Sequence, residues 1–176
     1  MNKSLKVISL YAGPGAGKST TAAGLFYLMK RNGMSAELVT EYAKEKVYDG
    51  FLGCLEDQIY IFGQQQRRLK RLVGHVEFAI TDSPILLSTL YNKDLSPTFD
   101  KFVLETYHSY SNIGFFIERA KPYVAVGRTQ DFAQACELDI KMENIIEKND
   151  IPVHYVRGDE FCTDTIYHII RDQHEK

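Results

Sequence analysis

The chain has 176 residues, 44% of them hydrophobic and 25% charged, which suits one domain with its own core and excludes a disordered or fibrous chain. Lys and Arg number 21 against 23 Asp and Glu, so the net charge of −2 excludes a bulk polycation, and any nucleic-acid binding would need a local basic patch. The three cysteines and five histidines show no ligand spacing and no apolar run could span a membrane, so we expect a cytoplasmic protein without a zinc site or a disulfide framework.

Short apolar runs alternate with stretches of helical periodicity along the first half of the chain. An apolar run that stops at a glycine-rich turn is typical of a buried parallel strand, and apolar residues three and four apart predict a helix with one buried face. We therefore expect a strand at residues 7–11, a helix that ends before Gly33, a strand at 36–39, and helices at 42–48 and 55–73. The long helix should bury the stripe formed by Leu55, Ile59, Phe62, Leu69 and Val73.

The same alternation continues through the second half of the chain. It predicts a strand at residues 76–81, a helix opened by Pro84, a strand at 113–117, a helix near 130–147, a strand at 153–156 and a closing helix around Ile166, Ile169 and Ile170. Strands that alternate with helices predict an α/β fold with a mostly parallel sheet covered by helices on both faces. Ligands of such sheets bind at the carboxyl ends of the strands.

The turn after the first predicted strand has the sequence G-P-G-A-G-K-S and opens a predicted helix, which is the context of a phosphate-binding loop. Its glycines let backbone N–H groups surround an anion, Lys18 can reach the β- and γ-phosphates, and the Ser19 hydroxyl can bind Mg²⁺. We expect the nucleotide to be held by Gly13, Pro14, Gly15, Ala16, Gly17, Lys18, Ser19 and Thr20.

Two observations bear on the specificity of this loop. Ala12 stands where the strict motif has its first glycine, which is a small departure. A dinucleotide fingerprint fits poorly, because Lys18 occupies the position of its third glycine. The alternative is a glycine-rich turn with a chance Lys-Ser pair.

Acidic residues follow two of the predicted strands. Asp82 ends the strand at 76–81 and is the candidate second anchor for Mg²⁺, or alternatively a turn-former beside Pro84. Glu41 follows the strand at 36–39, where a carboxylate could face the phosphate loop as the base that activates an acceptor, or merely favour a helix N-terminus.

A switch GTPase is the competing class of P-loop protein. It would need D-x-x-G after the strand that ends at Asp82, but Ser83, Pro84 and Ile85 follow. It would also need N-K-x-D, whereas the stretch at residues 92–95 carries its Asp one position early. The sequence therefore favours a kinase.

Basic residues occupy two further segments. Arg119, Lys121 and Arg128 flank a polar segment at about 119–130 that we predict to be a small lid on a single domain of residues 1–176, with a solvated loop as the alternative. On the long helix a basic arc spans roughly 160° opposite the apolar stripe and could meet the phosphates of DNA, with Tyr60 nearby to stack on a base, or simply face solvent. This basic arc consists of Arg67, Arg68, Lys70 and Arg71.

Three motifs carry a resemblance to small phage-type P-loop kinases. They are the stretches at residues 13–21 (GPGAGKSTT), 39–45 (VTEYAKE) and 80–84 (ITDSP). Such kinases are related to the ribosylnicotinamide kinase domain of NadR-type proteins and to deoxynucleoside and thymidylate kinases. Within that group the chain looks most like kinases that phosphorylate 5-hydroxymethyluracil already in DNA. The resemblance implies a P-loop NTPase fold, nucleotide and Mg²⁺ contacts from Lys18 and Ser19, Asp82 at the metal or acceptor, and Glu41 near the acceptor.

The leading hypothesis is therefore an ATP- and Mg²⁺-dependent kinase, with Lys18, Glu41, Asp82, Arg119 and Arg128 as its catalytic residues. Its acceptor would be the hydroxymethyl group of a modified uracil in phage DNA, and its location the host cytoplasm if a phage encodes it. The alternative acceptor is a free nucleoside or nucleotide such as ribosylnicotinamide or a deoxynucleoside. A nucleotide-dependent switch or binding module is the non-enzymatic alternative.

Overall fold

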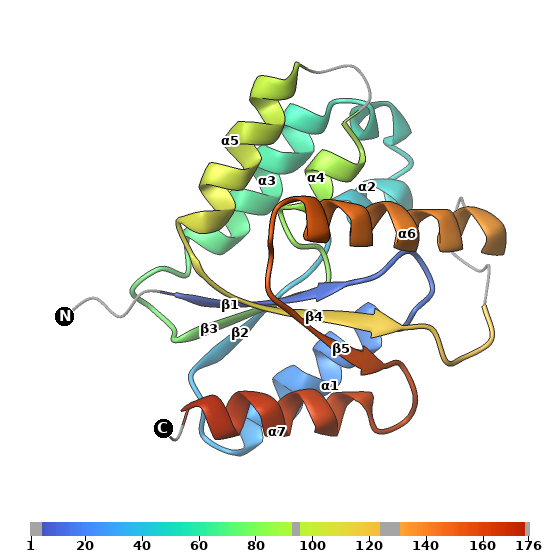
Figure 1. The fold of residues 1–176 in the computed structure, drawn as a ribbon. Helices are drawn as coiled ribbons and strands as arrows, with labels where there is room; N and C mark the ends of the chain where they lie inside the picture. The colour runs from blue at the N-terminus through green and yellow to red at the C-terminus, as the bar shows by residue number, and fades with distance from the viewer. Residues whose placement is uncertain (1–4, 93–95, 124–130, 175–176) are drawn as a thin grey trace.

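A parallel β-sheet forms the centre of the protein in the computed structural model, which describes residues 5–92, 96–123 and 131–174 (Figure 1). The strands of this part of the chain lie in the order β2-β3-β1-β4-β5, and each neighbouring pair is parallel. They are β1 (Lys6–Tyr11), β2 (Ala36–Val39), β3 (Phe78–Thr81), β4 (Ser111–Glu118) and β5 (Val153–Arg157). The expected strands are thus confirmed, with β1 at the centre of the sheet.

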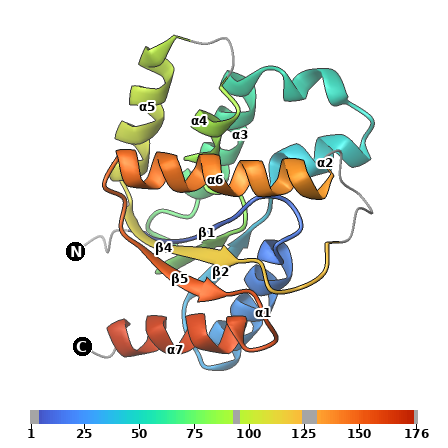
Figure 2. The ribbon, with the colours of Figure 1, turned by 45° about the vertical axis from the view of Figure 1, so that its right-hand side comes forward.

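Helices cover both faces of this sheet. Helices α1 and α7 lie on one face, and α3, α5 and α6 lie on the other (Figures 1 and 2). The helical elements are α1 (Lys18–Arg31), α2 (Tyr42–Tyr48), the 3₁₀ turn η1 (Leu52–Leu55), α3 (Gln58–Lys70), α4 (Leu87–Leu90), α5 (Pro97–His108), α6 (Phe132–Lys148) and α7 (Cys162–His174). This arrangement confirms an α/β P-loop NTPase fold with helices on both faces.

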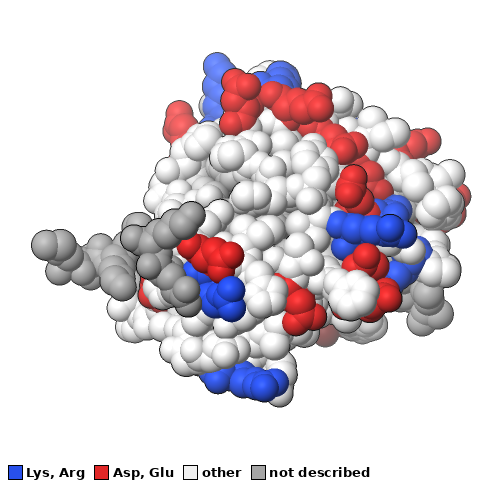
Figure 3. Space-filling view, turned by 60° about the horizontal axis from the view of Figure 1, so that its bottom comes forward, with Lys and Arg blue, Asp and Glu red and all other residues white. Residues whose placement is uncertain are grey.

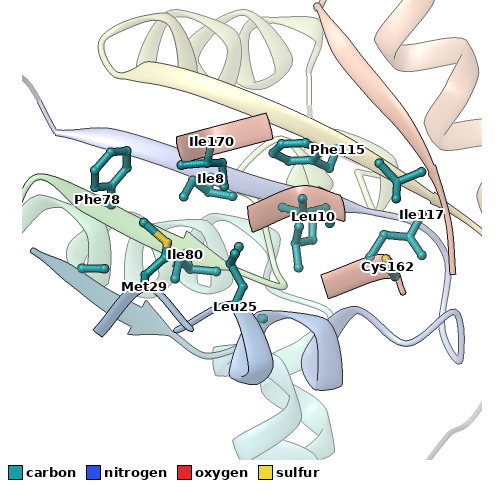
Figure 4. Packing of buried hydrophobic residues seen from close by; sticks show 14 of the residues in the cluster. Ile8, Leu10, Leu25, Met29, Phe78, Ile80, Phe115, Ile117, Cys162 and Ile170 are labelled. Atoms are coloured by element: carbon teal, nitrogen blue, oxygen red, sulfur yellow. The ribbon is translucent and has the colours of Figure 1, made fainter. Parts of the chain in front are cut away.

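Strand β1 supplies alternate residues to two hydrophobic cores, because side chains of a strand point to opposite faces in turn. Ile8 and Leu10 pack with Leu25 of α1 and Ile170 of α7, a cluster seen from close by in Figure 4. Val7 and Tyr11 point to the opposite face, where α3, α5 and α6 supply the partners. With a core on each face, the central strand and the loop that follows it are held from both sides.

Helix α3 is shorter than the predicted helix at residues 55–73, and its buried face differs. Because η1 occupies Leu52–Leu55, α3 begins only at Gln58. Asp57 caps the helix by accepting a hydrogen bond from the backbone N–H of Tyr60 at 3.0 Å. Phe62 and Leu69 are buried as predicted, but Ile59 is 58% and Val73 37% exposed. Ile59 points roughly 90° away from the buried face and Val73 lies beyond the helix end, so placing them in the stripe was wrong.

Helix α5 was not predicted from the sequence, although Ser96 and Pro97 carry the signal for its start. The Ser96 hydroxyl accepts a hydrogen bond from the backbone N–H of Thr98 at 3.3 Å, and Pro97 occupies the first turn. The residue expected to open a helix, Pro84, instead lies in a turn before α4, and its carbonyl accepts from the backbone N–H of Leu87 at 2.9 Å.

Charged side chains of both signs are interspersed on the face shown in Figure 3, in agreement with the small net charge. Among the described residues, no helix combines the length and apolar character needed to cross a membrane.

Candidate functional site

The phosphate loop connects the central strand β1 to helix α1 and needs glycine at two positions. Gly15 has a φ of +81° and Gly17 a φ of +101°, in the left-handed region that favours glycine. Gly17 is also the capping residue just before α1, and its carbonyl accepts from the backbone N–H of Thr21 at 2.9 Å. The helix N-terminus and the loop amides therefore meet at one point, which makes an anion site.

The start of the loop is closely packed. A Cβ atom on Gly13 would collide with the backbone carbonyl oxygen of Ala135 and would lie 2.9 Å from Nη2 of Arg119, so no larger side chain fits. The backbone N–H of Gly13 donates to Asp139 Oδ1. Ala12 is 3% exposed and its methyl group belongs to the core beneath the loop, which explains why alanine is accepted there.

Lys18 folds back over the loop. Its Nζ donates to the carbonyl oxygens of Ala12 at 2.7 Å and Gly13 at 2.9 Å. Burial lowers the pKa of Lys18, while the nearby carboxylates of Glu41, Asp82 and Asp139 oppose that shift. The ammonium group thus lies among acidic side chains at the mouth of the loop, where a phosphate would meet it.

A cavity of about 460 Å³ lies beside the loop. Its walls come from the loop itself, from the ends of β2 and β3, and from helices α2, α3 and α4. Glu41 and Asp82 line it together with loop residues Gly13, Pro14, Gly15, Gly17, Lys18, Ser19 and Thr20. The predicted carboxylates and the predicted phosphate loop therefore face the same space.

Glu41 follows β2 and precedes the first residue of α2. It occupies the capping position of that helix, but its side chain makes no capping hydrogen bond and lines the cavity instead. Burial raises the pKa of Glu41, and the positive charge of Lys18 acts against that rise. The carboxylate is thus a stronger base than an exposed glutamate.

Asp82 follows β3 and is 6% exposed. Its Oδ1 is buried and has no hydrogen-bond partner within the part of the chain that the structure describes. A buried carboxylate oxygen without a partner is costly unless a ligand supplies a positive charge, and Mg²⁺ prefers oxygen donors. Asp82 and the exposed Ser19 hydroxyl fit Mg²⁺. The described residues hold no cluster of three His, Cys, Asp or Glu side chains, so phosphate and water oxygens would complete the coordination shell.

Gln65 of α3 ties the two acidic positions together and was missed in the sequence. Its Oε1 accepts from the backbone N–H of Tyr42 at 3.1 Å, and its Nε2 donates to the carbonyl of Thr40 at 3.3 Å and to Oγ1 of Thr81 at 3.5 Å. These contacts hold the residues on both sides of Glu41 and the residue before Asp82. The available signal was a single polar residue between Phe62 and Leu69 on a buried helix face.

Tyr91 is a second cavity residue that sequence reasoning missed. It follows α4 and lines the cavity together with Glu41. Burial, helped by the negative charge of Glu41, raises the pKa of Tyr91 to about 12. The phenol therefore remains a hydrogen-bond donor beside the acid to a higher pH than an ordinary tyrosine does.

Of the predicted lid residues, the structure describes Arg119 and Lys121. Arg119 forms an ion pair with Asp139 of α6 and donates from Nη2 to the carbonyl of Ala135 at 3.3 Å, and it does not line the cavity. Arg128 lies outside the described residues, and Lys121 is exposed.

The basic arc does not line the cavity either. Arg68 forms an ion pair with Glu45 at 2.5 Å and donates to Oγ1 of Thr40 at 3.1 Å. The other three members, Arg67, Lys70 and Arg71, are exposed. Tyr60, expected to stack on a base, places its hydroxyl 2.5 Å from that of Tyr42.

Comparisons with known proteins agree with this geometry. The model of the AAA domain family matches residues 7–161. Deoxyadenosine kinase from M. mycoides with bound dATP is 20% identical with a TM-score of 0.57, over 97% of this chain and 100% of that one. Thymidylate kinase from Ehrlichia chaffeensis is 14% identical with a TM-score of 0.62, over 98% of this chain and 100% of that one. No curated protein matches the sequence. At these identities the two structures establish a shared fold.

Proposed function

The chain belongs to the AAA domain family, and from this membership and its cavity we propose that it is an ATP-dependent kinase that phosphorylates a hydroxyl group. The observation that carries the proposal is a cavity with the phosphate loop on one side and the carboxyl groups of Glu41 and Asp82 on another. A switch or binding module needs only the phosphate site, whereas phosphoryl transfer needs a donor and an acceptor group that face each other.

On the donor side, we assign the phosphates of ATP to the loop of residues 13–20. The amides at the start of α1 bind phosphate oxygens, and Lys18 leaves its two carbonyl partners to neutralise the group in transfer. Ser19 and Asp82 would hold Mg²⁺, which when bound offsets the charge that develops on the phosphate oxygens.

On the acceptor side, we assign Glu41 as the general base. As the acceptor oxygen bonds to the γ-phosphorus, its proton passes to the Glu41 carboxylate, and the bond from the γ-phosphorus to the oxygen it shares with the β-phosphate breaks to release ADP. The burial that raises the pKa of Glu41 supports this role, because it makes the carboxylate a better proton acceptor.

For the cover of the site, we propose a lid at residues 119–130 on a single domain of residues 1–176. Arg128 is the proposed lid group for the developing charge. The ion pair of Arg119 with Asp139 favours a different role for Arg119.

We infer that the acceptor carries a nucleoside, and two forms of it have separate support. The resemblance in the sequence favours the hydroxymethyl group of hydroxymethyluracil in DNA. A free nucleoside is favoured by the ion pair between Arg68 and Glu45, which engages one member of the basic arc within the protein, and by the position of the arc outside the cavity.

Transfer of label from γ-labelled ATP tests the proposal. The protein is incubated in parallel with hydroxymethyluracil-containing DNA, plain DNA of the same sequence, and a panel of free nucleosides and nucleotides. A labelled acceptor supports a kinase, and its identity decides between DNA and the free nucleoside. ATP binding without transfer to any acceptor would support a binding module and contradict the proposal.

A further inference from the structure

Asp139 of α6 has no part in the reaction described above, yet it contacts the phosphate loop directly. Its side chain is 15% exposed, and each of its two oxygens has a partner. Oδ1 accepts from the backbone N–H of Gly13, and Oδ2 pairs with Nε of Arg119. One carboxylate therefore joins the first turn of the loop to the residue that follows β4.

Arg119 completes this contact from the other side. Its Nη2 donates to the Ala135 carbonyl at 3.3 Å and lies 2.9 Å from the position that a Gly13 Cβ would occupy. The guanidinium group is thus packed against the loop backbone and held by two residues of α6, one turn apart. Helix α6 passes over the sheet on the side of β4 in both ribbon views (Figures 1 and 2).

A negative charge next to a phosphate loop needs a reason, because it repels the phosphates of the nucleotide. The negative charge of Asp139 acts to raise the pKa of Lys18, and the positive charge of Arg119 acts to lower it. The two charges therefore act on the loop as a neutral pair. If Arg119 alone were removed, an uncompensated carboxylate would remain at the nucleotide site.

We propose that Asp139 is a positioning residue of the nucleotide site. It fixes the first turn of the phosphate loop through the Gly13 amide, and Arg119 neutralises its charge. The inference rests on the proposed binding of ATP at residues 13–20. It assigns Arg119 to the support of the loop, where the sequence suggested direct contact with the transferring phosphoryl group. The two roles predict opposite outcomes when both side chains are altered.

The first test is the affinity for Mg²⁺-ATP, measured by titration calorimetry without any acceptor. Arg119→Met should weaken binding about tenfold or more, because it leaves Asp139 unpaired near the phosphates. The double variant with Arg119→Met and Asp139→Asn should regain part of the lost ATP affinity. Asp139→Asn alone should weaken binding several-fold, and Glu137→Gln, an exposed change on the same helix, should bind like the wild type.

A double variant that binds no better than Arg119→Met would overturn the inference, since direct phosphate contact by Arg119 gives that result. A wild-type protein that does not bind ATP would instead remove the proposed function and the inference together. Folding is checked by thermal denaturation, and equal ATP affinity in all folded variants would also overturn the inference.

The second test does not depend on ATP. In the ¹H–¹⁵N spectrum of the full chain, Asp139→Asn should move the Gly13 amide proton upfield, because a neutral acceptor replaces a charged one. The same proton should not move in Glu137→Gln. An unchanged Gly13 resonance in Asp139→Asn would show that the hydrogen bond does not hold the loop.

Discussion

The two sides of the cavity are built in different ways. The donor side is the continuous segment of residues 13–20, whose form depends on backbone torsions and on glycines at defined positions. The acceptor side is assembled from the ends of β2 and β3 and from helices α2, α3 and α4, which contribute single side chains such as Glu41, Asp82 and Tyr91. The loop therefore has the form of a general phosphate site, and the proposed recognition of the acceptor depends on single side chains of the assembled side.

The largest effect is expected at the donor side, from Lys18→Ala. Removal of the ammonium group should lower kcat about 10²- to 10³-fold, because no other loop side chain can neutralise the group in transfer. Initial rates of ADP formation, with the acceptor that the labelling experiment identifies, measure this fall in kcat. Lys101→Ala, an exposed change on α5, should leave the rate unchanged. A Lys18→Ala enzyme with near wild-type kcat would contradict the assignment of the loop.

Glu41→Gln tests the acceptor side in isolation. It should lower kcat about 10²-fold and leave the KM for ATP unchanged, because the amide cannot take the proton of the acceptor hydroxyl. Only the ionised carboxylate is a base, so the wild-type rate should fall as the pH falls through the raised pKa of Glu41. That acidic limb should be absent from the pH profile of Glu41→Gln and present in the control Glu56→Gln, whose side chain is exposed. An acidic limb that persists in Glu41→Gln would assign the base to another group.

The difference between a continuous loop and a side assembled from distant segments also explains what could be predicted from the sequence. The phosphate loop was identified because its signal is contiguous, and the strands were found because buried parallel strands are short apolar runs. Asp82 was singled out because it directly follows such a strand, and Glu41 because one residue, Thr40, separates it from the end of another. The fold class follows from that alternation, and the five parallel strands of the described residues confirm it.

The missed residues depend on contacts between segments far apart in the chain. Gln65 lies 25 positions from Thr40 and 16 from Thr81, and Asp139 lies 126 positions from Gly13. In the sequence Asp139 resembles an ordinary polar residue on a helix, and the place of Gln65 between Phe62 and Leu69 does not reveal its partners. The position of Ile59 was predicted wrongly for a related reason, because the face of α3 that is buried depends on where the helix meets the sheet and α5.

Gln65→Leu should have an intermediate effect that is confined to the acceptor side of the cavity. Leucine fills the volume but leaves the Tyr42 amide without its acceptor, so we expect a loss of about 1–3 kcal/mol in the free energy of unfolding. Because Glu41 is next to Tyr42, kcat should also fall while ATP affinity stays the same. Urea denaturation and calorimetry measure these quantities, and Gln64→Leu, on the same helix, is the matched control. An equal loss of ATP affinity would show that Gln65 supports the donor side as well.

The smallest effect is expected from Gly63→Ala, in the middle of α3. A Cβ atom at this position would meet no atom within 4 Å, and the backbone is helical. Alanine should therefore raise the free energy of unfolding by about 0.5–1 kcal/mol, since glycine loses more conformational entropy on folding. Because α3 carries Gln65 on its buried face and Gly63 on its exposed face, the helix can be stabilised without a change in the cavity. Equal kinetic constants in Gly63→Ala and the wild type would support a preformed acceptor side, and a fall in kcat with the gain in stability would show that α3 must move during the reaction.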